Sequence, residues 1–181
     1  MFKTFQLIGR WLIDRKVKRR SKSVFSDHIS KAKNVLIIAN SNEAGVEKAL
    51  QNHVSFLRQQ KINNLSLLMF SDMKNAVEIK THTNQIIVTK KKFNWLGFPS
   101  DSEVRKIVAK RYSSIICLSL EPTYLMVNLI ALINSNLKVG VSTKKTTTYF
   151  DLTIAKSSQK KDKFVSFVKN LNHYLDLINR K

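Results

Sequence analysis

The chain has 181 residues and a formal net charge of +20, because 32 lysines and arginines face only 12 aspartates and glutamates. Its length fits one domain, and its hydrophobic content of 43% excludes a chain that is disordered throughout. A single cysteine, Cys117, excludes an internal disulfide, and no cysteine or histidine shows the spacing of a zinc site. We therefore expect a folded domain without a metal site, and a charge excess this large favours a polyanionic partner.

The N-terminal segment combines an apolar stripe with a dense block of positive charge. Apolar residues recur at helical spacing from Phe2 to Leu12, and basic residues fill the other face as far as Lys22. The charge follows the apolar stretch, unlike in a signal peptide, and no stretch reaches the ~20 apolar residues of a spanning helix. We expect a basic amphipathic helical extension over residues 1–33, a single α/β domain over residues 34–181, and a cytoplasmic location.

The remaining chain alternates short apolar runs with helical patterns. Apolar runs rich in branched side chains predict strands at residues 34–39, 65–70, 85–89, 114–120, 137–142 and 150–155. Helical spacing predicts helices at residues 43–61, 101–111, 122–134 and 162–180, the first capped by Ser41 or Asn42 and the second by Ser100 or Asp101. Strands joined by helices predict a three-layer α/β sandwich with a mainly parallel, Rossmann- or flavodoxin-like sheet.

Four segments carry a resemblance to a known family. They are FNWLG at residues 93–97, ICLSLE at 116–121, LKVG at 137–140 and YFDLTI at 149–154. In these segments the chain resembles an uncharacterised bacterial family of small basic α/β proteins of unknown function, and the likeness extends over nearly the whole chain. The resemblance implies a compact single domain and brings no activity, cofactor or site residue with it.

Basic residues gather in several blocks. Each phosphate neutralised by a lysine or arginine releases counterions, so such blocks give affinity for nucleic acid of any sequence. No helix-turn-helix, zinc-finger or zipper pattern is present, which favours structured RNA over DNA. A solvated basic surface is the alternative. The candidate RNA-binding residues are Arg15, Lys16, Lys18, Arg19, Arg20, Lys22, Lys90, Lys91, Lys92, Trp95, Arg105, Lys106, Lys110, Arg111, Lys144 and Lys145.

Trp95 belongs to this set because it follows the Lys90 to Lys92 triplet in a loop that also holds Phe93 and Phe98. Exposed aromatic rings stack on unpaired bases. Aromatic side chains in a loop also serve to fix that loop to the domain. The sequence leaves both roles open for Trp95.

Two other function classes remain as alternatives. An α/β enzyme acting on a phosphorylated or nucleotide substrate would bind it beyond the carboxyl ends of the strands, near Asn40, Ser71, Glu121 and Ser142. No Walker or dinucleotide glycine spacing supports this, and Cys117 fits a core position better than a reactive one. A peripheral membrane protein would use the N-terminal helix on an anionic surface.

The sequence thus predicts a non-enzymatic protein that binds structured RNA. Ribosomal RNA, together with ribosomal proteins, is the expected partner of such a ribosome-associated or ribosome-assembly protein. We expect no catalytic residue, metal or cofactor.

Overall fold

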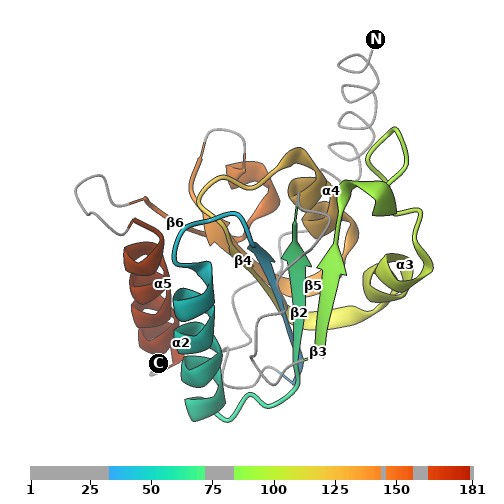
Figure 1. The fold of residues 1–181 in the computed structure, drawn as a ribbon. Helices are drawn as coiled ribbons and strands as arrows, with labels where there is room; N and C mark the ends of the chain where they lie inside the picture. Colours follow the sequence, from blue (N-terminus) through green and yellow to red (C-terminus); the bar gives the residue numbers. More distant parts are fainter. Residues whose placement is uncertain (1–32, 72–83, 144–145, 157–162, 180–181) are drawn as a thin grey trace.

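The computed structural model describes residues 33–71, 84–143, 146–156 and 163–179 (Figure 1). The predicted N-terminal helical extension therefore lies outside the described residues, apart from Lys33. In chain order the elements are β1 (Val35–Asn40), α2 (Val46–Gln59), β2 (Leu65–Phe70), β3 (Asn84–Val88), the short 3-10 helix η2 (Lys90–Lys92), α3 (Ser102–Ala109), β4 (Arg111–Leu118), α4 (Tyr124–Leu132), β5 (Asn134–Val141), the 3-10 helix η3 (Thr147–Tyr149), β6 (Leu152–Ile154) and α5 (Lys163–Asn179).

Six strands form one sheet in the order β3-β2-β1-β4-β5-β6, and every neighbouring pair is parallel. This confirms the predicted parallel α/β sheet, and the order is that of the doubly wound Rossmann fold. The chain moves outward from β1 to β3 in one direction and from β4 to β6 in the other. Because β1 and β4 are neighbours, the sheet has its topological switch point between their carboxyl ends.

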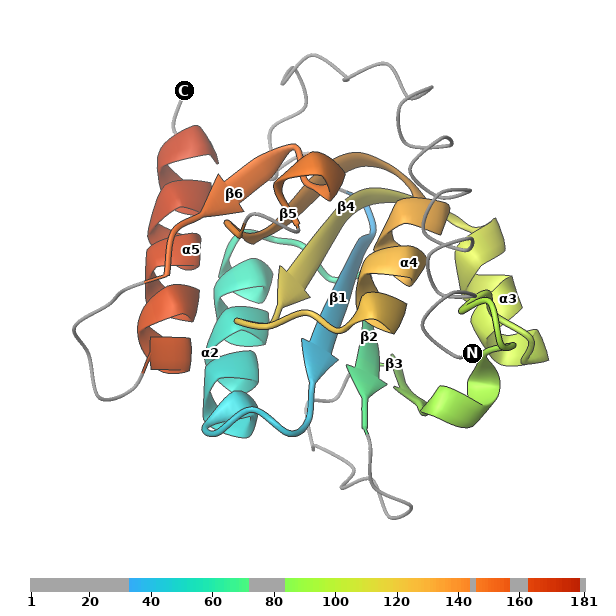
Figure 2. The same ribbon diagram turned by 90° about the horizontal axis from the view of Figure 1, so that it is seen from above.

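Helices cover both faces of the sheet, and Figure 2 shows the three layers edge-on. Helices α2 and α5 lie on one face, and α3 and α4 lie on the other. Side chains of β1 alternate between the two layers: Ile37 packs with the α2–α5 side, whereas Leu36 and Ile38 pack with the α3–α4 side. Both faces of such a strand are buried, so polar side chains are disfavoured along it. This explains the continuous apolar run from which the strand is predicted.

The ends of the helices differ from the sequence prediction in a few places. Helix α2 begins at Val46, three residues later than predicted, and neither Ser41 nor Asn42 caps it. Gly45 occupies the N-cap in the left-handed conformation with φ 77°, because the preceding residues form a turn. Asp101 caps α3 as predicted, accepting hydrogen bonds from the backbone N–H groups of Glu103 and Val104.

Candidate functional site

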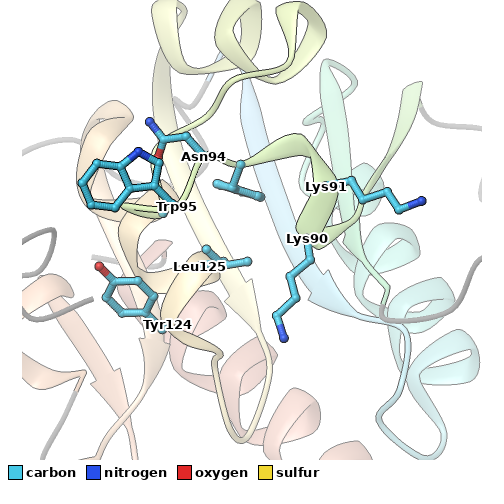
Figure 3. A pocket seen from close by; sticks show the side chains of 8 residues that line it. Lys90, Lys91, Asn94, Trp95, Tyr124 and Leu125 are labelled. Atoms are coloured by element: carbon cyan, nitrogen blue, oxygen red, sulfur yellow. The ribbon is translucent and has the colours of Figure 1, made fainter. Parts of the chain in front are cut away.

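A pocket of about 380 Å³ lies at the carboxyl edge of the sheet, between the segment after β3 and the start of α4 (Figure 3). We call it the Trp95 pocket. The elements that form it are about thirty positions apart in the sequence and meet because all the strands run in the same direction. Its lining residues are Lys90, Lys91, Phe93, Asn94, Trp95, Gly97, Tyr124 and Leu125.

The loop at residues 93–99 carries Trp95 and is held in shape by its own hydrogen bonds. The side-chain Oδ1 of Asn94 accepts from the backbone N–H groups of Leu96 (3.1 Å) and Phe98 (2.9 Å). Phe93 is buried and stacks on Phe70 of β2 with ring centroids 6.0 Å apart. Phe93 therefore fixes the loop to the core, while Trp95 keeps 59% of its surface exposed. The loop is ordered, as predicted, without Trp95 being buried in it.

The loop rests on the first turns of α4. Asn128 is 1% exposed, and its side-chain amide donates to the Gly97 carbonyl at 3.3 Å. The Tyr124 hydroxyl donates to the Leu96 carbonyl at 3.3 Å. Gly97 has φ 81°, and a Cβ added there would lie 2.7 Å from Nδ2 of Asn128. Only glycine fits this position, since the backbone is left-handed and also approaches α4 closely.

Aromatic and cationic groups occupy different sides of the Trp95 pocket. Figure 3 shows the rings of Trp95 and Tyr124 on one side, Leu125 in the middle, and Lys90 and Lys91 on the other side. Both lysines are exposed and belong to η2. The pocket thus offers flat apolar surfaces at one end and positive charge at the other, and none of its lining residues is acidic.

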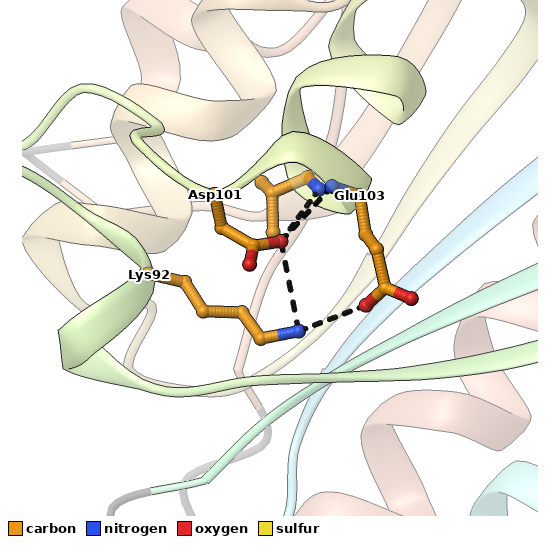
Figure 4. Close-up of polar contacts among 4 residues, drawn as sticks. Lys92, Asp101 and Glu103 are labelled. Carbon is orange, nitrogen blue, oxygen red and sulfur yellow. Dashed lines mark hydrogen bonds and ion pairs between the residues drawn. The ribbon is translucent and has the colours of Figure 1, made fainter.

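Lys92, the third member of the predicted triplet, does not line the Trp95 pocket. Its Nζ lies 3.1 Å from Glu103 Oε2 and 3.7 Å from Asp101 Oδ1, at the start of α3 (Figure 4). The hydrogen bond from the Val104 backbone, followed by the positive charge of Lys92, lowers the pKa of Asp101 below its ordinary value. The ion pairs connect η2 to α3.

The other predicted site residues are not brought together. Arg105 and Lys106 are exposed on α3, whereas Lys110 and Arg111 lie where β4 begins, at the opposite edge of the sheet from the Trp95 pocket. One guanidinium nitrogen of Arg111 donates to Asn136 Oδ1 at 3.1 Å. Outside the described residues lie Arg15, Lys16, Lys18, Arg19, Arg20, Lys22, Lys144 and Lys145.

Sequence reasoning missed Tyr124, Leu125 and Asn94 as site residues. The Glu121–Pro122 pair did predict a helix start, and that start brings Tyr124 to the carboxyl edge of the sheet. The packing of the loop against that turn has no signature in the sequence. In contrast, Cys117 is a fully buried core residue, as predicted, and burial raises the pKa of its thiol.

Two kinds of feature are absent from the described residues. Within residues 33–71, 84–143, 146–156 and 163–179, no group of three or more histidine, cysteine or acidic side chains is arranged to hold a metal ion. No helix in these same ranges is long and apolar enough to cross a membrane.

Comparisons with solved structures found glycosyltransferases. The first is a family 9 glycosyltransferase from Veillonella parvula DSM 2008 with a TM-score of 0.49 and 13% identity, covering 83% of this chain and 43% of that chain. E. coli heptosyltransferase WaaC with ADP gives a TM-score of 0.42 and 14% identity, covering 77% and 46%. The same enzyme with ADP-2-deoxy-2-fluoro heptose gives 0.44 and 14%, covering 77% and 47%.

This chain spans less than half the length of those proteins, and at such low identity the likeness concerns the fold. A search of curated proteins found no match.

The structural comparisons overturn the function predicted from the sequence. The structures found are of transferases, and the two structures of WaaC are described with ADP or an ADP-sugar analogue. The predictions of a non-enzymatic protein, of RNA binding and of ribosomal partners are therefore wrong. The fold gives a physical reason. The predicted RNA-binding residues that the structure describes are divided among the Trp95 pocket, α3 and the opposite edge of the sheet, and Lys92 forms an ion pair with Glu103.

The sequence-based family assignment, in contrast, is confirmed. The model of a family of unknown function, DUF6913, matches residues 6–178, which is nearly the whole sequence. The chain belongs to this family, DUF6913.

Proposed function

We propose that this protein is an α/β enzyme that binds a nucleotide, or a related phosphorylated substrate with a flat ring, in the Trp95 pocket. The observation that carries the proposal is the arrangement of that pocket: an exposed Trp95 beside Tyr124 at one end, and Lys90 and Lys91 at the other. Ligands of doubly wound folds bind at this carboxyl edge of the sheet.

The two ends of the pocket suit the two parts of a nucleotide. A base stacks on an indole ring with about 1–3 kcal/mol of stabilisation. Lysine ammonium groups neutralise phosphate oxygens, and the lack of an acidic lining residue leaves their charge available. A cavity of about 380 Å³ also falls within the size range of small-ligand sites, roughly 300–1,000 Å³.

The pocket is preformed, which favours binding of a small ligand. The buried side chain of Phe93 anchors the loop in the core, and Asn94 accepts a hydrogen bond from the backbone within the loop. Asn128 of α4 donates a hydrogen bond to the Gly97 carbonyl. A ligand that enters such a rigid site does not have to order the loop first, so less of the interaction energy is lost.

Isothermal titration calorimetry with ADP, adenosine and inorganic pyrophosphate tests the proposal. We expect ADP to bind more tightly than either fragment, because only ADP reaches both ends of the pocket. Trp95→Ala should weaken ADP binding about 5- to 150-fold, the equivalent of 1–3 kcal/mol. A double variant, Lys90→Ala with Lys91→Ala, should weaken ADP and leave adenosine unchanged.

The matched control is Lys106→Ala, which removes an exposed lysine of α3 outside the pocket. It should leave ADP affinity unchanged. If Lys106→Ala loses as much ADP-binding free energy per charge removed as the Lys90–Lys91 double variant, net charge alone attracts the ligand and the proposed site is refuted.

A further inference from the structure

A second polar arrangement lies at the switch point, apart from the Trp95 pocket. Here β1 continues into the turn before α2 on one face of the sheet, while β4 continues toward α4 on the other face. Open α/β sheets bind ligands in the crevice that this divergence creates. In this protein an acidic side chain from the turn after β1 reaches the end of β4 at this switch point.

Glu43 reaches from the turn after β1 to the end of β4. Its Oε1 and Oε2 accept from the backbone N–H of Leu120 at 2.9 and 3.0 Å, and Oε1 also accepts from the Ser119 hydroxyl. Ser119 is fully buried, so its hydroxyl depends on this partner. A backbone amide and a hydroxyl that converge on one carboxylate form an oxyanion-binding arrangement, and hydrogen bonds to a charged acceptor are the stronger kind.

The position of Glu43 is set by a short turn. Its backbone N–H donates to the Asn40 carbonyl at 3.3 Å, and Gly45 takes a left-handed conformation two residues later. Because of this turn, α2 begins at Val46 and not at residue 43, where the sequence predicts it. Residues 43–45 are therefore not helical, and the Glu43 carboxylate lies beside the two donors.

The charge of Glu43 is not neutralised by a salt bridge: among the ion pairs of the described residues, none includes Glu43. Its negative charge is felt nearby, since it is a second cause, after burial, of the raised pKa of Cys117. A carboxylate held by two neutral donors makes the hydrogen bonds that an anionic ligand group would make.

We propose that Ser119 Oγ and the Leu120 backbone N–H form a phosphate-binding site, and that the Glu43 carboxylate is its tethered competitor. The ligand class is a phosphate group, whose oxygens accept the same two hydrogen bonds. An attached competitor acts at a high local concentration, so a phosphate has to displace it. Glu43 thereby excludes weakly bound phosphate from these two donors.

The test is a titration with inorganic phosphate, followed by NMR of the backbone amides of Ser119 and Leu120. Glu43→Ala should bind phosphate at least about tenfold more tightly than the unmodified chain, since the lost carboxylate hydrogen bonds are among the stronger class. Glu47→Ala is the matched control, because Glu47 is an exposed acid in the first turn of α2. It should leave phosphate affinity unchanged.

Three results would overturn the proposal: no gain in Glu43→Ala, the same gain in Glu47→Ala, or a gain without changes at the two amides. If Glu43→Ala does not fold, Glu43→Gln takes its place, since it keeps the shape and one acceptor while removing the charge; a smaller gain is then expected, and none would refute the idea. Trp95→Ala should not alter this titration, so the two proposals succeed or fail separately.

Discussion

Acidification should destabilise the fold through His53, which lies at the interface of α2 and α5. Its ring is fully buried, Nδ1 lies 2.6 Å from Asn172 Oδ1, and Nε2 has no hydrogen-bond partner within the described part of the chain. Burial lowers the pKa of His53 from 6.5 to about 4, against the opposing effect of the hydrogen bond to Asn172. The folded state therefore keeps His53 neutral over a range in which the unfolded chain binds a proton.

The sign and size of the effect follow from proton linkage. Between pH 6.5 and about 4 the unfolded state binds more protons, so the free energy of unfolding falls as the pH falls. One pKa unit corresponds to about 1.4 kcal/mol, so the shift of roughly 2.5 units gives a loss of about 3 kcal/mol across this window. Asp101 has a lowered pKa as well, but its contribution is lost only below its ordinary value of 3.8.

Urea denaturation at intervals from pH 7.5 to 4.5 measures this loss. We compare the unmodified chain with His53→Gln, which keeps a donor for Asn172 and does not titrate. The variant should lose most of the pH dependence between pH 6.5 and 4.5, whereas His173→Gln, at an exposed position of α5, should retain it. If His53→Gln shows the same slope as the unmodified chain, the burial argument is refuted.

Three further predictions concern packing and reactivity. Gly140→Ala should lower the free energy of unfolding by about 1–3 kcal/mol in urea denaturation, because the new Cβ would lie 2.3 Å from the ring of Phe150. Adding Phe150→Leu to this variant should recover part of the loss. An unchanged stability of Gly140→Ala would contradict the close packing of Gly140 against Phe150. Gly97→Ala should lower the free energy of unfolding by about 1–2 kcal/mol because its backbone is left-handed, and it should also weaken ADP binding. Normal ADP affinity in a destabilised variant would show that the loop is not part of the ADP site. Cys117 should not react with a disulfide reagent in the folded protein and should react once urea unfolds it; fast labelling without urea would contradict its burial.

The fold was predictable to the extent that burial leaves a pattern in the sequence. Strands β1 and β4 are covered on both faces, so their continuous apolar runs identify them. The start of α2 was not predictable, because Glu43 fits the first turn of a helix equally well. Its actual partners, Ser119 and Leu120, are 76 and 77 positions away.

The candidate site was predictable only in part. Trp95 and the lysines beside it stand out in the sequence, but their separation into Lys90 and Lys91 at the pocket and Lys92 at α3 depends on tertiary contacts. Tyr124 lies in the same pocket as Trp95 only because the chain, after β3, passes through α3 and β4 and returns to this edge of the sheet at the start of α4. Net charge pointed to the wrong partner because it is a property of the whole surface and says nothing about the shape of a site.

We infer that the exposed indole of Trp95 contacts the ring of the bound nucleotide. The sequence has two tryptophans, so Trp11→Phe leaves Trp95 as the single indole fluorophore. Titrating this variant with ADP should quench its fluorescence to saturation, with the same dissociation constant as calorimetry gives, and adding Lys90→Ala with Lys91→Ala should shift the curve to higher ADP concentration. An indole signal that does not change while ADP binds, or no ADP binding at low salt, would contradict the claim.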